Sequence, residues 1–148
     1  MAIWQYDLFV IGEGSALPLL SGDGWELPHL PAAMTLIAQR ILTGSLGHPW
    51  LMMDDWIVFG NEQSTGVDLM FYEPDSVEIR IRMDASAVDE ELDAICAFAV
   101  ALQVRIFDPA TRILLQPDRN AVAAALASSC AAAFPRSPRS FLAGLAKD

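Results

Sequence analysis

The sequence predicts an α+β fold, with a mixed or antiparallel, hairpin-rich sheet and helices packed on it. Two observations predict this class. Segments in which apolar and polar residues alternate, as in strands, are interspersed with segments in which apolar residues recur every three or four positions, as in helices. Most of the expected strands also follow one another through short turns, which favours hairpins. A ferredoxin-like core with additions is one arrangement with this order of elements.

The chain has the size and composition of one globular domain. Its 148 residues match the length of an ordinary domain, and 53% of them are hydrophobic, which is enough to form a core and argues against disorder. The sequence contains no internal repeat and no interdomain linker. Residues 1–148 are therefore expected to form a single domain.

The first elements expected are a strand over residues 3–11 and a helix from Pro31 to Thr43. Pro31 suits the first helical position, and Gly44 suits the residue after the last. Residues 12–29 and 44–55 are rich in loop-forming residues, so we expect two long loops there. The shared face of the strand is Trp4, Tyr6, Leu8 and Val10, and the apolar stripe of the helix is Ala33, Ile37 and Ile41.

The clearest hairpin joins alternating segments at residues 67–72 and 77–83, after a short strand from Trp56 to Phe59. Register follows the buried face, so we expect a loop with an odd number of residues, centred on Pro74-Asp75-Ser76. This register places Phe71 opposite Ile79, Leu69 opposite Ile81, and Asp68 opposite Arg82. The last pair is then a cross-strand ion pair, worth under about 1 kcal/mol at an exposed position.

The second half is predicted to hold helices and a further hairpin. A helix over 87–103 is expected, with Ser86 as its cap, and strands at 104–107 and 113–115 flank a turn. Asp118 is expected to cap a helix that runs to about Phe134, and a last short helix begins near Ser137-Pro138. The buried stripe of the 87–103 helix is Val88, Leu92, Ile95, Ala99 and Leu102.

The negative charge of the protein is confined to the first half of its sequence. The net charge is −10, and residues 1–79 contain eleven acidic residues but a single basic one, Arg40, whereas residues 80–148 contain eight of each. An acidic surface repels phosphate backbones and anionic lipids, so neither nucleic acid nor a membrane is expected as a partner. It suits a basic protein partner. Solubility combined with a genomic bias in composition is the alternative explanation.

The cysteines and the N-terminus indicate a cytoplasmic protein. Cys96 and Cys130 occur in apolar, helix-like segments without a CxxC spacing, so we expect buried thiols and a reducing compartment. The first residues lack the basic and apolar regions of a signal peptide. No apolar run approaches the roughly 20 residues that a membrane span needs.

The sequence contains no recognisable motif for catalysis, a metal or a cofactor. Gly12-Glu13-Gly14 follows an expected strand but lacks the third glycine of a dinucleotide-binding loop, and neither a P-loop nor a GxSxG motif occurs. His29 and His48, the only histidines, each lie in a loop shortly before a proline, without the spacing of metal ligands. We therefore expect no catalytic residue, no metal and no cofactor, and favour a non-enzymatic protein.

Aromatic and acidic residues gather in the loops of the acidic half, and they predict a surface that binds a partner. Aromatic anchors surrounded by acidic residues are typical of surfaces that recognise a basic protein. The candidate partner-binding residues are Trp25, Trp50, Asp54, Asp55, Trp56 and Glu62. The alternative is that the tryptophans pack the core or the loops.

A pattern between Val77 and Leu142 points to a family. Its parts are the strand at 77–84, the helix ending in Phe98-Ala99-Val100-Ala101, the hairpin at 107–112, and the segments Gln116-Pro117-Asp118, Ser128-Ser129 and Pro138-Arg139-Ser140-Phe141-Leu142. This pattern resembles small, stand-alone bacterial proteins, some of which are similar to immunity proteins of toxin systems. The resemblance implies a non-enzymatic protein that binds and neutralises a toxin. It assigns no functional residue.

Two other functions fit the same sequence. A small-molecule-binding domain or enzyme, with a pocket between sheet and helices, would use His48, Asp68, Arg80 and Arg82. A self-associating structural subunit would pair the basic segment Arg136-Ser137-Pro138-Arg139 with the acidic half of a second copy, which would give a homodimer.

Overall fold

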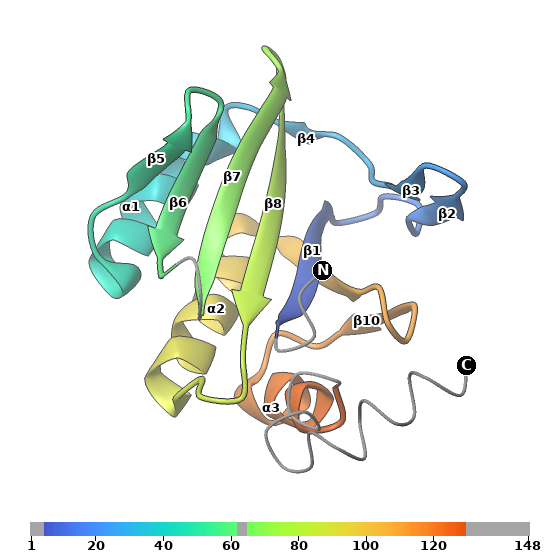
Figure 1. Ribbon diagram of the computed structural model, residues 1–148, viewed down its shortest axis with the longest axis vertical. Helices are drawn as coiled ribbons and strands as arrows, with labels where there is room; N and C mark the ends of the chain where they lie inside the picture. The colour runs from blue at the N-terminus through green and yellow to red at the C-terminus, as the bar shows by residue number, and fades with distance from the viewer. Residues whose placement is uncertain (1–4, 62–64, 130–148) are drawn as a thin grey trace.

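The computed structural model of the protein describes residues 5–61 and 65–129, which form an α+β fold of three helices and a large sheet (Figure 1). The helices are α1 (Met34–Leu46), α2 (Asp89–Leu102) and α3 (Arg119–Ala127). The strands are β1 (Tyr6–Gly12), β2 (Leu19–Ser21), β3 (Gly24–Glu26), β4 (Leu30–Pro31), β5 (Trp50–Met53), β6 (Trp56–Gly60), β7 (Gly66–Glu73), β8 (Ser76–Met83), β9 (Val104–Asp108) and β10 (Ile113–Leu115).

The eight-stranded sheet has the order β10-β9-β1-β8-β7-β6-β5, with β4 paired to β8. All strand pairs among the described residues are antiparallel. The path β1, α1, β7, β8, α2, β9 follows the βαββαβ order of a ferredoxin-like core, and β5, β6 and β10 extend its two edges. The expected α+β class, with a hairpin-rich sheet and helices packed on it, is confirmed.

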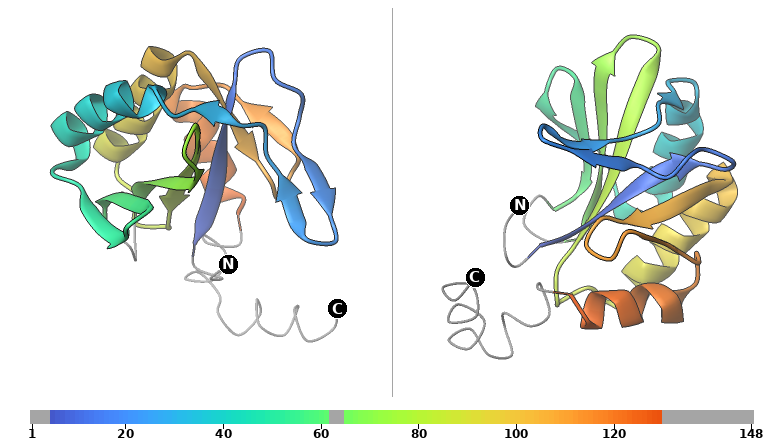
Figure 2. Two further views of the ribbon diagram at one scale, coloured as in Figure 1. Left: turned by 90° about the horizontal axis from the view of Figure 1, so that it is seen from above. Right: turned by 90° about the vertical axis from the view of Figure 1, so that its right-hand side faces the viewer.

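One face of the sheet packs against the helices and forms the core. Alternate residues of the central strands point to this face, and Leu8, Leu69 and Ile81 are completely buried there. Figure 2 shows α1 and α2 on one side of the sheet and the β2–β3 hairpin on the other. The intervening residues of β7 and β8 therefore face away from the helices, and Asp68 and Arg80 are among them.

The β7–β8 hairpin has a different register from the expected one. Its turn has two residues, Pro74 and Asp75, and a β-bulge between Met70 and Glu73 shifts the pairing. Leu69 therefore lies opposite Ile79, and Asp68 lies opposite Arg80. The expected loop with an odd number of residues was wrong. The turn has two residues, and the β-bulge adds one residue to β7, which returns the apolar side chains to the same face of the sheet. The division of residues between the two faces is as expected.

Two regions expected to be loops contain short strands. Residues 19–26 form the β2–β3 hairpin, and residues 50–53 form β5, which pairs with β6. The glycines and prolines of both regions lie mainly in the connections between strands. Because the strands between them have only three or four residues, the composition of each region predicted a loop.

Helix α1 begins and ends three residues later than expected. Leu30 and Pro31 pair with β8 as a strand, and Gly47, with φ of 90°, follows the last helical residue. Gly44 therefore lies inside the helix. The shift changes the buried stripe, which the sequence placed at Ala33, Ile37 and Ile41. The buried residues are Thr35, Ala38 and Leu42.

The remaining helices begin close to the expected positions. Four members of the expected α2 stripe are buried, but Val88 is exposed. The expected cap was wrong: Val88 is the N-cap residue of α2, and its N–H donates to the carboxylate of Glu91. The hydroxyl of Ser86 donates to Asp84 instead. Asp118 caps α3 as expected, by accepting from the N–H of Ala121 at 2.9 Å. Among the described residues, no helix is long and apolar enough to cross a membrane.

Several expectations concern residues outside the described ones. They are Trp4, Glu62, Cys130, the helix near Ser137 and the basic segment Arg136–Arg139. The prediction that the helix capped by Asp118 runs to about Phe134 was wrong, because α3 ends at Ala127. Ser128 is its C-cap residue, and the hydroxyl of Ser129 donates to the carbonyl of Leu126, as serines do where they compete with helical hydrogen bonds.

Candidate functional site

The edge strand β5 is apolar and exposed along its whole length. Relative exposures are 37% for Trp50, 62% for Leu51, 37% for Met52 and 61% for Met53. β5 pairs with β6 on one side and is the terminal strand of the sheet. These four residues, called the β5 edge below, form a run of exposed apolar side chains of the kind that marks interaction sites.

Four exposed carboxylates lie at one end of the sheet, next to the β5 edge. Asp54 and Asp55 form the turn between β5 and β6, Asp75 lies in the turn between β7 and β8, and Glu73 directly precedes that turn. Both turns lie at the upper end of the sheet in Figure 1, and the carbonyl of Asp55 accepts from the N–H of Phe71 at 2.9 Å. We call these four residues the acidic end. Neither turn contains a basic residue.

Tyr72 reports the charge of this region. Burial raises the pKa of its hydroxyl, and the carboxylates of Glu78 and Asp55 raise it further, against an opposing effect of Arg80. Burial also raises the pKa of Glu78. The exposed aromatic ring of Tyr72 thus lies close enough to Asp55 of the acidic end to feel its charge.

The three tryptophans predicted to bind a partner lie at two separate places. Trp50 belongs to the β5 edge, and its Nε1–H donates to the carbonyl of Gly60 at 3.1 Å. Trp56 is half-buried on β6, under the guanidinium of Arg80 at 5.7 Å. Trp25 lies on β3, with its ring edge-to-face against Phe107 of β9 at 5.3 Å. Because β9 and β5 lie near opposite edges of the sheet, Trp25 does not join the other two.

A buried ion cluster lies on the face of the sheet opposite the helices. Oδ2 of Asp68 accepts from Arg82 Nε at 2.9 Å and from Arg80 Nη2 at 3.1 Å. The side chain of Asp68 is 1% exposed, that of Arg82 5% and that of Arg80 25%. The expected Asp68–Arg82 ion pair is therefore present, but it is buried and joins residues that are diagonal across the hairpin.

Gly66 makes room for this cluster. A Cβ atom at Gly66 would lie 2.6 Å from Nη2 of Arg82 and 2.4 Å from the carbonyl oxygen of Phe59. Nη1 of Arg82 donates to the carbonyl of Asn61 at 2.7 Å. The guanidinium of Arg82 therefore lies between its own strand β8, the neighbouring strand β7 and the residue that follows β6.

A small cavity of about 180 Å³ adjoins the cluster. It is lined by Gln5, Met52, Trp56, Val58, Asp68, Arg80 and Arg82. Three residues that the small-molecule hypothesis named are therefore brought together, but His48 is not among them, and the cavity lies on the face opposite the helices. Trp56 Nε1, Asp68 Oδ1 and Arg80 Nε are buried there without a hydrogen-bond partner.

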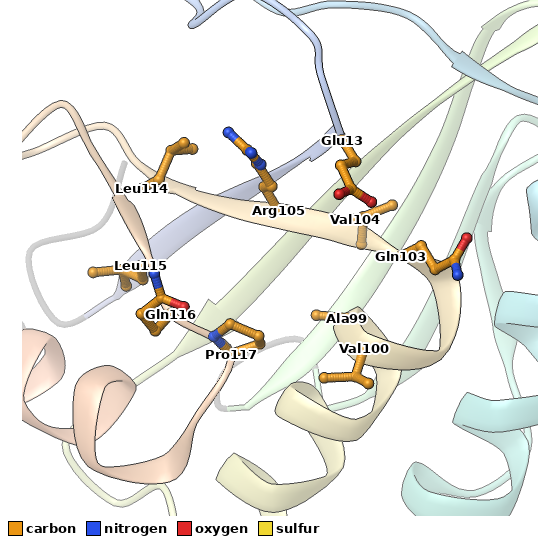
Figure 3. A pocket seen from close by; sticks show the side chains of 10 residues that line it. All are labelled: Glu13, Ala99, Val100, Gln103, Val104, Arg105, Leu114, Leu115, Gln116 and Pro117. Atoms are coloured by element: carbon orange, nitrogen blue, oxygen red, sulfur yellow. The ribbon is translucent and has the colours of Figure 1, made fainter.

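A larger cavity, of about 450 Å³, lies where α2 ends beside β9 and β10 (Figure 3). Ala99 and Val100 of α2 line one side, and Gln116 and Pro117 lie after β10. The polar side chain of Glu13 lies on the other side of β9 from α2 in this view. Glu13 is its only carboxylate, and no histidine, cysteine or hydroxyl side chain lines it, so its geometry supports no specific chemistry.

Cys96 and the potential metal ligands are the remaining groups to place. Cys96 is buried, and burial, followed by the charges of Asp118 and Asp93, raises the pKa of its thiol, which opposes formation of the nucleophilic thiolate. No group of three or more potential metal ligands occurs in residues 5–61 and 65–129.

Comparison with known proteins gives no relative: no protein-family model matches the chain, and neither the curated proteins nor the solved structures contain a significant match.

Proposed function

We propose that this protein is a non-enzymatic binding protein that recognises a basic partner protein through the β5 edge and the acidic end. The observation that carries the proposal is the exposure of all four apolar residues of β5 directly before Asp54 and Asp55. An immunity-type role, in which the partner is a basic toxin that is blocked by binding, is the form of this proposal that the sequence resemblance suggests.

The composition of this surface supports binding to a protein. Protein interfaces combine an apolar centre with a polar rim, and Trp and Met are enriched in them. Here Trp50, Leu51 and Met53 supply apolar area, and the acidic end supplies a rim of one sign. A negative rim accelerates encounter with a basic partner and discourages acidic ones. Of the residues that the sequence predicts to bind a partner, Trp50, Asp54 and Asp55 belong to the proposed surface, and half-buried Trp56 lies on the neighbouring strand β6. Trp25 does not belong to it.

The test begins with affinity capture from the organism of origin, followed by measurement with the purified partner. Isothermal titration calorimetry is expected to show binding that weakens as salt rises, because exposed charges are screened. Charge reversal of Asp54 and Asp55 to Lys is expected to weaken binding. The matched control reverses Asp23 and Glu26, which are also exposed acids, on the β2–β3 hairpin.

Two results would contradict the proposal. One is a partner that binds both charge-reversed variants with the affinity of the unaltered protein. The other is association of the protein with itself through the β5 edge, seen as a dimer in light scattering that Leu51→Arg converts to a monomer. That second result would support the self-association alternative instead.

A further inference from the structure

We infer that the partner binds by β-strand addition, in which an extended basic segment pairs with β5 and continues the sheet. This inference rests on the proposed function, and it specifies the backbone of β5, in addition to its side chains, as the recognition element. An extended peptide that adds to a sheet edge gains main-chain hydrogen bonds for affinity and side-chain pockets for specificity.

The two edges of the sheet differ in their protection. At one edge, β10 has three residues and lies beside α3, since Ile113 and Leu115 line a cavity together with Ala121 and Ala124 of that helix. At the other edge, no described element pairs with the outer side of β5. Figure 1 places α1 behind β5 and β6, so the helix covers a face of this edge and leaves its outer side open.

The sequence of β5 lacks the charged and proline residues that protect many edge strands. Proteins protect edge strands with charged residues, above all Lys, and with Pro, whereas Trp50-Leu51-Met52-Met53 contains neither. A β-bulge between Leu51 and Met53 is present, but Trp50 and Leu51 remain in regular register with Val58 and Ile57. Alternate residues of a strand direct their N–H and C=O groups to one side, so β5 offers about four hydrogen bonds to an added strand.

The charges near β5 indicate what the added segment contains. Asp54 and Asp55 follow β5 directly and are exposed, and no basic residue lies in that turn. A segment paired with β5 therefore gains from Lys or Arg where it passes the turn. Its alternate apolar side chains would lie beside Trp50 and Met52 on one face and beside Leu51 on the other, because side chains alternate along a strand.

The experiment uses the full chain and a nine-residue peptide of alternating Lys and Val, with blocked ends, as the probe. Binding is followed through the fluorescence of Trp50, with a Trp50→Phe variant as the check on the signal. Fluorescence titration is repeated with the peptide N-methylated at every residue, and with two peptides N-methylated at alternate residues. N-methylation removes backbone donors but keeps the side chains, which separates strand pairing from side-chain docking.

The expected pattern has a period of two. The fully methylated peptide is expected to bind at least tenfold more weakly, equivalent to about 1.4 kcal/mol, while one of the half-methylated peptides keeps nearly the affinity of the parent. Leu51→Arg is expected to weaken binding of the parent peptide. Val100→Arg, at a residue of α2 that is 59% exposed, is the matched control and is expected to have no effect.

The failures of the two proposals are distinguishable. If Leu51→Arg weakens binding but methylation does not, strand addition is overturned and the β5 edge remains a binding surface. If the parent peptide does not bind at millimolar concentration, strand addition is also overturned, and the proposed function is judged with the native partner. If Val100→Arg and Leu51→Arg weaken binding equally, the peptide does not bind at the β5 edge and strand addition is overturned, while the proposed function is again judged with the native partner.

Discussion

Replacing Asp68 by Asn is expected to destabilise the protein strongly, although the two side chains have almost the same shape. Asp68 is 1% exposed, and its Oδ2 accepts from both Arg80 and Arg82. Asn removes the negative charge and leaves two guanidinium groups beside a neutral amide, one of them 5% exposed. Loss of one partner from a buried ion pair costs about 3–5 kcal/mol, because the remaining charge stays buried without compensation.

The lower end of that range, about 3 kcal/mol, applies here. The amide oxygen of Asn can still accept a hydrogen bond, Arg82 keeps its bond to the carbonyl of Asn61, and Arg80 is 25% exposed and so partly solvated. With a urea m-value of roughly 2 kcal/mol/M, the unfolding midpoint is expected to fall by about 1.5 M. This is a large part of the 5–15 kcal/mol that is typical of a domain.

The assay is urea unfolding followed by circular dichroism, with Asp93→Asn as the control. Asp93 forms a bidentate ion pair with Arg119, but both side chains are about half exposed, so the midpoint of this variant is expected to stay nearly unchanged. Equal, small shifts for the two variants would refute the reasoning, since they would mean that the Asp68 cluster is solvated in solution.

Three further predictions concern stability. Tyr6→Phe is expected to cost about 1–3 kcal/mol in chemical unfolding, because buried Asp108 loses the donor that lies 2.6 Å from its Oδ2. Burial, then the bond to Asp108, raises the pKa of Tyr6 above its ordinary value of about 10, so the stability of the unaltered protein falls as pH rises past 10, and Tyr6→Phe lacks this contribution. Gly66→Ala is expected to cost about 1–3 kcal/mol by thermal unfolding, since its Cβ would meet the Phe59 carbonyl at 2.4 Å; an unchanged melting temperature would show that the strands separate without cost. Asp118→Ala is expected to cost about 1 kcal/mol through loss of the α3 cap, and Asp118→Ser should restore most of it.

The sequence predicts the fold class and the faces of the central strands because both follow from apolar periodicity. Leu69, Ile79 and Ile81 alternate with charged residues, and the structure places them in the core as the alternation requires. The register of the same hairpin is not predictable in this way. An odd turn and an even turn with a bulge both keep the apolar face, and no sequence signal distinguishes them here.

The candidate site is predictable only in part, for a related reason. The sequence singles out Trp50, Asp54 and Asp55, but it assigns them to a loop, because Gly47 and Pro49 precede them and the strand that follows has only four residues. The edge position of β5 depends on the strand order of the whole sheet, which is a property of long-range pairing. The position of Trp25 depends on how the β2–β3 hairpin folds onto Phe107, which no local pattern encodes.

The acidity of residues 1–79 has a different meaning in three dimensions. Strand β8 spans the boundary between the two halves, and its Arg80 and Arg82, the first bases of the second half, neutralise Asp68 of the neighbouring strand. The exposed negative charge is therefore smaller than the difference between the two halves of the sequence suggests. Asp54 and Asp55, beside the β5 edge, are part of this exposed charge. Binding and stability are consequently separable in this protein. Leu51 and Met53 of the β5 edge are 62% and 61% exposed and contribute little buried area, so their substitution should alter recognition and leave the unfolding midpoint nearly intact. Substitutions in the buried Asp68 cluster should have the opposite effect.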